Sequence, residues 1–224
     1  MPRNAEDTRA QIIQAAERLF AERGVDAVSL REINREAGQR NATALQYHFT
    51  DRQGLIRSIL MKHDVMVDQS RNQLLDEMEK KGQQSLYHFA AALVLPAAKK
   101  LADRDGGRAY LRIVAQLVSG YRPGVDPVEQ IATSESLNRW RVSVAPEMSS
   151  IAVTPLHSRF TATRIMFVEL ARRAESPRRK DDRLFTSHLI DLVTALLGAP
   201  VSDRTRVLLK ERQKGLNEVF VSRG

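Results

Sequence analysis

The stretch from residue 29 to residue 52 constrains this 224-residue chain most strongly, because it holds two short helical patterns separated by a glycine. Ser29 can cap the first helix by accepting a hydrogen bond from an unpaired backbone N–H group. Three apolar residues then recur at i, i+3 and i+7, and Gly38 follows where the chain must leave the helix. A second helix is expected over 41–48. Two short helices joined by a tight turn are typical of a helix-turn-helix that reads DNA.

The same stretch resembles the DNA-binding head of the tetracycline-repressor (TetR) family. Its most specific part is the run LQYHF with a basic residue three positions after the phenylalanine, and the segment TRAQIIQAAERLFAERG precedes it. Six residues separate Gly38 from Leu45, one more than in the commonest family pattern. The residues that carry the resemblance are Leu30, Ile33, Ala37, Gly38, Leu45, Tyr47, His48, Phe49, Arg52 and Leu55.

A further helix is expected before this pair, and it completes a three-helix DNA-binding domain that we place at residues 1–56. Asp7 or Thr8 can cap this helix, apolar residues follow at helical spacing, and Gly24 closes it. Arginines and acids are equal in number within 1–52, so the net charge of +8 is not concentrated in the head. Between 39 and 62, however, basic residues outnumber acidic ones, which puts positive charge at the edge expected to meet DNA.

Three residues are candidates for contacts with DNA bases: Arg40, Asn41 and Thr43. They lie at or before the first turn of the second helix, the end that enters the major groove in helix-turn-helix proteins. Arginine can fork onto guanine, asparagine can pair with adenine, and threonine can offer its methyl group to thymine. Alternatively, Asn41 caps the helix and Arg40 is a solvated turn residue. Gln39 and Gln46 are secondary candidates.

Four residues are candidates for contacts with DNA phosphates: Ser29, Tyr47, His48 and Arg52. Ser29 and Arg52 stand at the amino ends of expected helices, where backbone N–H groups and the helix dipole favour an anion. The resemblance implies the same role for Tyr47 and for the basic position that Arg52 occupies. His48 could instead be packed within the head.

The remaining residues, 57–224, are expected to be helical, so the predicted fold class is all-α. A long helix capped by Thr50 or Asp51 should run toward residue 82, broken or bent on the way. Further helices are expected over 85–103 with a kink or break at Pro96, then over 109–121, 127–140, 155–174 and 184–197, with a last, marginal helix from Ser202 to about 214. Strand signals are nearly absent. No linker-like segment separates the two parts, which should therefore be mechanically joined.

The resemblance implies that the body is a helical ligand-binding and dimerisation domain. Two late helices carry apolar stripes, which could be plain core or could pair with their symmetry mates, and a palindromic operator requires such an isologous dimer. The interface candidates are Phe160, Phe167, Phe185, Leu189, Leu192 and Leu196. The candidates for lining a pocket are Phe89, Leu93, Tyr110, Val114, Leu117, Tyr121, Trp140 and Phe167, although ordinary core packing would explain each of them equally well.

Several classes of function are disfavoured. The absence of cysteine excludes disulfides, thiolate metal sites and cysteine nucleophiles, and it suits a reducing cytosol. The histidines are scattered, so we expect no metal, and no nucleotide-binding or hydrolase motif points to a cofactor or to an enzyme. No apolar run is long enough to span a membrane and no signal peptide is indicated. We therefore expect a cytoplasmic protein.

These features predict a homodimeric repressor of transcription that binds a palindromic double-stranded DNA operator and is released by an unidentified small-molecule effector. In the mechanism that the resemblance implies, the effector prefers a conformation with mis-spaced heads and thereby lowers operator affinity. A DNA-binding regulator without a small-molecule ligand is one alternative. The other is an all-α enzyme or a protein-interaction module with a vestigial helix-turn-helix head, and the missing catalytic motif argues against the enzyme.

Overall fold

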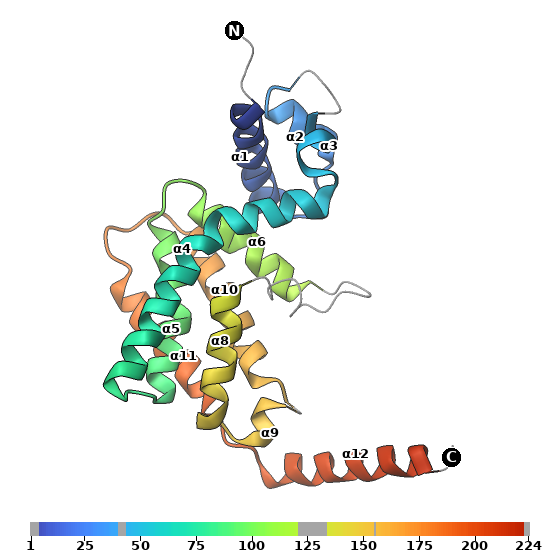
Figure 1. Cartoon of the computed structure of the whole chain (residues 1–224), viewed down its shortest axis with the longest axis vertical. Coiled ribbons are helices and arrows are strands. Elements are labelled where there is room, and N and C mark those ends of the chain that lie inside the picture. The colour runs from blue at the N-terminus through green and yellow to red at the C-terminus, as the bar shows by residue number, and fades with distance from the viewer. Residues whose placement is uncertain (1–4, 40–43, 121–133, 155, 222–224) are drawn as a thin grey trace.

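The computed structural model describes residues 5–39, 44–120, 134–154 and 156–221, which form helices and no strand. A small head stands at one end of the molecule and a larger helical body at the other, with one long helix running between them (Figure 1). The predicted all-α architecture is therefore confirmed.

The head consists of α1 (Ala5–Arg23), α2 (Leu30–Glu36) and α3 (Ala44–Phe49). Because α1 begins at Ala5, the expected cap at Asp7 or Thr8 is wrong. Asp7 lies instead in the first turn, where a negative charge suits the positive end of the helix dipole. The buried apolar core of the head is formed by Ile12, Phe20, Val28, Ile33, Leu45 and Phe49, with Leu55 and Ile59 from the next helix.

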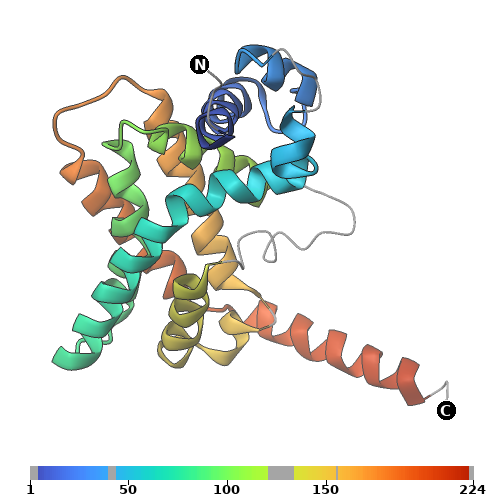
Figure 2. The ribbon, with the colours of Figure 1, turned by 45° about the horizontal axis from the view of Figure 1, so that its top comes forward.

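The long helix α4 (Arg52–Lys81) joins head and body. Asp51 caps it by accepting a hydrogen bond from the N–H of Gly54 at 2.7 Å, as one of the two predicted caps. Gly82 ends it in the left-handed region, at φ 62°, which glycine adopts at little cost. The helix is continuous from Arg52 to Lys81 and changes direction between the head and the far end of the body, so the helix that we expected to be broken or bent is bent (Figure 2). The domain boundary expected after residue 56 falls inside this helix.

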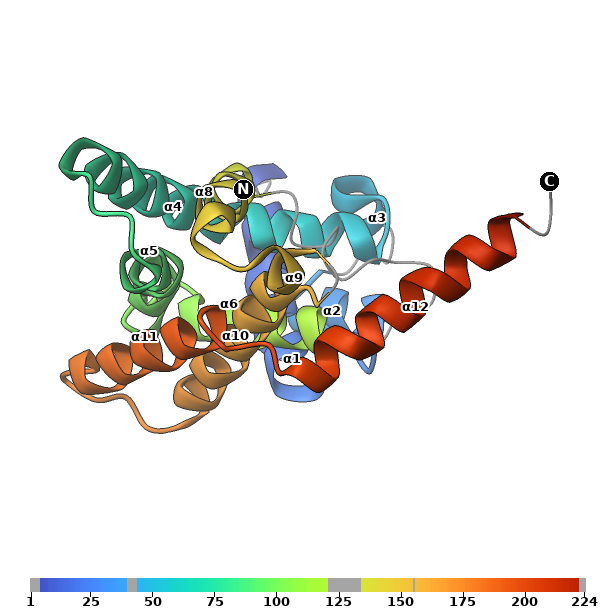
Figure 3. The same cartoon turned by 90° about the horizontal axis from the view of Figure 1, so that it is seen from below.

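The body follows α4, and its helices pack mainly as α6 on α10 and as α5 on both α4 and α11. The last helix projects away from the rest of the body (Figure 3). The elements of the body are α5 (Leu86–Ala98), η1 (Lys99–Leu101), α6 (Gly107–Ser119), α8 (Glu135–Val144), η2 (Ala145–Glu147), α9 (Ser150–Val153), α10 (Ser158–Glu175), α11 (Arg183–Leu197) and α12 (Asp203–Val221).

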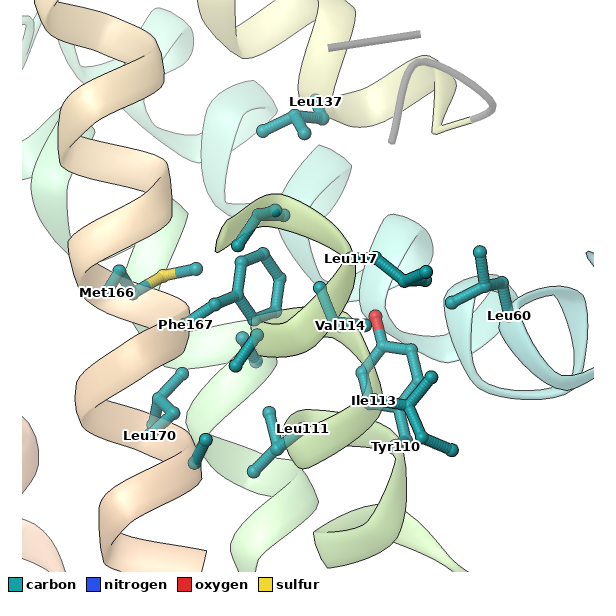
Figure 4. Packing of buried hydrophobic residues seen from close by; sticks show 14 of the residues in the cluster. Leu60, Tyr110, Leu111, Ile113, Val114, Leu117, Leu137, Met166, Phe167 and Leu170 are labelled. Atoms are coloured by element: carbon teal, nitrogen blue, oxygen red, sulfur yellow. The ribbon is translucent and has the colours of Figure 1, made fainter. Parts of the chain in front are cut away.

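Apolar side chains from α6 and α10 meet in the middle of the body (Figure 4). Leu111 and Val114 of α6 lie opposite Phe167 and Leu170 of α10, and all four are buried. Trp140 of α8 is also buried, and its indole Nε1–H donates to the carbonyl of Phe89 at 2.8 Å. The polar atom of this large side chain is therefore satisfied inside the core.

Several expected boundaries are wrong, each for a local reason. The helix expected over 127–140 begins at Glu135, because Ser134 caps it by accepting from the N–H of Leu137 at 3.1 Å. Residues 121–133, with the start that we expected, lie outside the described residues. Thr154 ends α9 instead of opening α10, which begins after His157, a residue with φ 51°.

Proline 96 does not break its helix. Helix α5 continues through Pro96 to Ala98 and only then tightens into the short η1. A proline near the end of a helix removes one hydrogen bond without interrupting a long run of them. At the carboxyl end of the chain, α12 reaches Val221, several residues past its predicted end.

Candidate DNA-binding surface and ligand cavity

The amino end of α2 is closed by a reciprocal cap. The N–H of Glu32 donates to Ser29 Oγ at 3.2 Å, and the N–H of Ser29 donates to Glu32 Oε2 at 2.8 Å. The cap predicted at Ser29 is confirmed. The hydrogen bond from the Ser29 backbone, with help from the Ser29 hydroxyl and Arg23, lowers the pKa of Glu32 to about 2. A phosphate that approached Ser29 would therefore meet a carboxylate at neutral pH, and the phosphate role of Ser29 stays a prediction.

The turn after α2 uses glycine as the sequence predicted. Gly38 has φ 66°, and its N–H donates to the carbonyl of Arg35 at 3.0 Å. The side-chain amide of Gln39 donates to Gln11 Oε1 and to the carbonyl of Ala37, both at 3.1 Å, so it is tied to α1. The three base-contact candidates Arg40, Asn41 and Thr43 lie outside the described residues, and so does the expected start of the reading helix.

Helix α3 turns Leu45 and Phe49 into the head core and leaves its other face outward. The side chain of Tyr47 is 83% exposed, and Gln46 is exposed beside it. His48 is half-buried, with its ring edge-on to that of Tyr47 at 5.2 Å between centroids. The outward face of α3 therefore presents an aromatic side chain and an amide, which agrees with the contact surface predicted there.

Arg52 is the basic residue that follows α3, and it is held against the head. Its Nη1 donates to the carbonyl of Val25 at 2.5 Å, and its guanidinium carbon lies 5.9 Å from the centre of the Phe20 ring. A guanidinium has five N–H donors, so this bond leaves others for a phosphate. The structure thus gives Arg52 a structural contact beside the predicted DNA contact, which remains a prediction.

A buried polar link connects the head to the body. His63 of α4 and Glu17 of α1 are both buried, and His63 Nε2 lies 2.9 Å from Glu17 Oε1, a hydrogen bond that the carboxylate accepts. Lys62 donates from Nζ to Glu17 Oε2 at 3.2 Å and to Asp105 Oδ1 at 2.8 Å. Gln116 of α6 adds a second tie, because its Oε1 accepts from the N–H of Val25 at 2.8 Å. The head is therefore fastened to α4 and to the α6 region, as the missing linker suggested.

A small cavity lies between α4, α6, α8 and α10, with a volume of about 20 Å³. That is room for roughly one water molecule and far below the several hundred Å³ of a typical ligand pocket. The residues that line it are Leu60, Asp64, Val67, Arg71, Tyr110, Val114, Leu117, Ser134, Leu137 and Phe167. Figure 4 shows Leu60, Tyr110, Val114, Leu117, Leu137 and Phe167 converging on this region.

The polar side of the cavity comes from α4, with partners on α6 and α8. The hydroxyl of Tyr110 donates to Asp64 Oδ1 at 2.7 Å, and Arg71 Nη1 donates to Ser136 Oγ at 2.7 Å. The hydroxyl of Ser134 donates to Asp68 Oδ1 at 2.5 Å, and that of Ser136 donates to the same oxygen.

Burial is the main cause that raises the pKa of Asp64 to about 6, against the lowering effect of the Tyr110 hydroxyl. Asp64 therefore changes charge close to neutral pH.

The cavity contains four of the eight pocket candidates: Tyr110, Val114, Leu117 and Phe167. Phe89, Leu93 and Trp140 are buried and do not line this cavity, and Tyr121 lies outside the described residues, so these four candidates stay predictions. The sequence analysis missed the α4 wall. Its signal was available, since residues 60, 64, 67 and 71 recur at helical spacing with two charged groups on an otherwise apolar face.

The two late helices, α10 and α11, expose part of their apolar stripes. Leu192 is 42% exposed, and Phe160, Phe185 and Leu196 are half-buried. Phe167 and Leu189 are buried within the single chain, and their place in an interface stays a prediction. The remaining four stay candidates for a subunit interface.

Comparison with known proteins shows what this arrangement is similar to. Residues 12–59 match the family of bacterial regulatory proteins, tetR family. The head of this chain is therefore similar to the DNA-binding segment of that family. The transcriptional regulator TtgR of Pseudomonas putida is 43% identical over 56 residues, which are 25% of this chain and 26% of that protein. The match thus spans about a quarter of the length of this curated relative.

Solved structures extend the likeness from the head to the fold of most of the chain. A mutant of HlyIIR aligns with a TM-score of 0.55 at 15% identity, covering 89% of this chain and 100% of that one. NalD of Pseudomonas aeruginosa, the secondary repressor of the MexAB-OprM multidrug efflux pump, aligns with a TM-score of 0.53 at 18% identity over 89% and 100% of the two chains. At such identities the likeness concerns the fold, a helix-turn-helix head on a larger helical body. The family consists of transcriptional regulators and not of enzymes.

Two classes of site are absent from the described residues. Among them, no group of three or more histidine or acidic side chains is arranged to hold a metal ion. Within the same ranges, no helix is long and apolar enough to cross a membrane.

Proposed function

We propose that this chain is a cytoplasmic, homodimeric repressor that binds a palindromic DNA operator through its head and is released by a small molecule bound in the body. The observation that carries the DNA-binding part is the outward face of α3, with Tyr47 on the surface, in a head that matches the TetR family over residues 12–59. The relative TtgR, which is 43% identical over 56 residues, is a transcriptional regulator.

In this proposal, Arg40 and Thr43 read bases, and Tyr47, His48 and Arg52 contact phosphates. Asn41 either reads a base or caps the reading helix. The excess of basic residues between 39 and 62 supports this division, because phosphate contacts from cationic groups supply much of the affinity of such proteins for DNA.

The proposed dimer uses α10 and α11 with their symmetry mates. Leu192 is exposed near the middle of α11, and Phe185 and Leu196 flank it on the same helix. Apolar side chains at such spacing would form the centre of an isologous interface, and two heads related by a two-fold axis would match the symmetry of a palindrome.

Release by an effector follows from the position of the cavity. A cavity of about 20 Å³ admits no effector unless one wall moves. One wall is α4, which carries the head and is joined to α1 through His63 and Glu17. A molecule that holds this wall apart would stabilise a different head position and lower operator affinity by its preference for that state.

The test is selection of bound sequences from a random double-stranded DNA pool, followed by a titration of the selected site at several salt concentrations. We expect a site with two-fold symmetry and a binding constant that falls steeply as salt rises. Light scattering without DNA should give the mass of a dimer at micromolar concentration. Failure to enrich any sequence would refute the DNA-binding proposal, and a monomer would refute the dimer.

A further inference from the structure

Arg71 of α4 is an unusual residue for the wall of an apolar cavity, because it is charged, 2% exposed and incompletely paired. Its Nη1 donates to Ser136 Oγ at 2.7 Å, while its Nε has no hydrogen-bond partner among the described residues. A buried guanidinium with an unused donor costs free energy that a suitable acceptor would recover.

The neighbouring carboxylate does not fill that need. Asp68 Oδ1 lies 3.6 Å from Arg71 Nη1, beyond a hydrogen bond, and accepts instead from the hydroxyls of Ser134 and Ser136. Two serines thus hold the acid to one side. The guanidinium remains able to take an acceptor that comes from the cavity, and its planar fork fits a carboxylate best.

We propose that the cavity between α4, α6, α8 and α10 receives a small molecule with an apolar body and a single carboxylate, and that Arg71 binds that carboxylate. The apolar body would lie against the other walls, which are formed by Leu60, Val67, Val114, Leu117, Leu137 and Phe167. The inference deepens the proposed function, since the ligand would be the effector, but the binding itself requires no DNA.

A carboxylate beside Arg71 also has a consequence for Asp64, which faces the same cavity. The groups around Asp64 are Asp68, Arg71 and His63 of α4 and the Tyr110 hydroxyl of α6, while Ser134 of α8 and Phe167 of α10 carry no titratable group. The pKa of Asp64 is already raised to about 6, chiefly by burial. A second anion nearby would raise that pKa further, so binding should take up a proton and weaken as pH rises.

A cation would behave in the opposite way. An ammonium group would pair with the ionised form of Asp64, so its affinity should increase as pH rises through 6. The sign of the pH dependence therefore distinguishes the two head groups. The incomplete pairing of Arg71 favours the anion.

The experiment uses three probes with the same eight-carbon chain: octanoate, octanamide and octylammonium. Each is titrated into the full-length protein by calorimetry at pH 6, 7 and 8, in two buffers with different ionisation enthalpies. We expect octanoate to bind at least about tenfold more tightly than the other two probes. Its affinity should fall by up to about tenfold per pH unit, and the complex should take up a proton on binding. Tighter binding of octylammonium, or no binding of octanoate, would overturn the proposal.

Two variants and a control locate the contact. Arg71→Gln should lower the affinity for octanoate by roughly 10- to 100-fold and leave the affinity for octanamide unchanged. Arg139→Gln is the matched control, because Arg139 of α8 pairs with Asp76 and Glu79 on the surface, outside the cavity lining. Equal binding by Arg71→Gln and wild type would overturn the assignment.

If Arg71→Gln fails to fold, Asp64→Asn provides the test. The asparagine can still accept the hydrogen bond from the Tyr110 hydroxyl, and the affinity of this variant for octanoate should not change between pH 6 and 8. An unaltered pH dependence in this variant would count against the site. Because these titrations contain no DNA, a negative result leaves the DNA-binding proposal standing, and failure of the DNA selection leaves the carboxylate site standing.

Discussion

The substitution Glu17→Ala should weaken the attachment of the head to the body more than a substitution at an exposed acidic residue of α1. The Glu17 and His63 side chains are only 3% and 2% exposed, so the hydrogen bond between them forms away from water. Its loss removes a hydrogen bond to a charged group, worth about 1.5–3 kcal/mol, and leaves the His63 nitrogen buried without that partner. Lys62 loses one of its two acids but keeps Asp105. We therefore expect a destabilisation of roughly 2–4 kcal/mol.

The matched control is Glu22→Ala, which removes the same residue type from an exposed position of the same helix. It should change the free energy of unfolding by less than about 0.5 kcal/mol. Thermal unfolding by circular dichroism measures both variants, and for a chain of this size 2–4 kcal/mol corresponds to a fall in Tm of roughly 4–16 °C. Glu17→Gln keeps an acceptor oxygen for His63 and should fall between the two.

Equal stability of Glu17→Ala and Glu22→Ala would refute the reasoning, since a buried pair and an exposed acid would then contribute alike. A stable Glu17→Ala protein whose α1 amides exchange faster with solvent would point to Gln116 as the main tie, because its side chain bonds both the N–H of Val25 and the carbonyl of Phe20.

Four further predictions concern the reading edge, the phosphate anchor, the interface and the cavity. Arg40→Ala and Thr43→Ala should each lose roughly 1–3 kcal/mol for the selected operator and relax the preference at one position per half-site, as measured by a binding titration over single-base variants. Arg52→Ala should weaken binding to all sequences alike and lower the salt slope by about one, and a changed sequence preference would make it a base reader. Leu192→Glu should give a monomer in light scattering or an unfolded chain in circular dichroism. Val142→Glu, at an apolar residue of α8 that is 73% exposed, should stay dimeric. The pKa of Asp64 is raised in the folded state from 3.8 to about 6. The free energy of unfolding should therefore fall by roughly 3 kcal/mol as pH rises from 4 to 6 and stay level above pH 6. Asp64→Asn should remove this slope in unfolding experiments at different pH values, whereas Asp76→Asn, on the surface, should not.

The parts of the fold that the sequence predicted well are those fixed within one or two turns of chain. The caps at Ser29 and Asp51 and the glycines at 38 and 82 satisfy backbone groups no more than five residues away, so their signal is local. Thr154 shows where such a signal fails. Threonine before proline favours a helix start, yet Thr154 completes the preceding short helix, and the next one begins only at Ser158.

The parts that the sequence could not predict depend on residues far apart along the chain. Glu17 and His63 are separated by 46 positions, and Arg71 and Ser136 by 65. Read singly, Glu17 resembles a surface acid of an amphipathic helix and Arg71 a surface base. Only the packing of α4 against α1 and α8 buries them, and no local pattern encodes that packing. For the same reason the pocket candidates on α6 and α10 were identified through their apolar character, while the charged wall on α4 was not.

Helix α4 carries all three features of the proposed release along its length. Ile59 lies in the head core, His63 bonds Glu17, and Arg71 reaches the cavity, about 18 Å from Ile59 at 1.5 Å per residue. A ligand that pushes α4 outward acts on α1 through the Glu17 contact, in addition to the packing of Leu55 and Ile59 of α4 in the head core. The strength of that contact therefore limits how far ligand binding changes the affinity for the operator. Glu17→Ala should accordingly keep its affinity for a carboxylate ligand and lose most of the ligand's effect on operator binding.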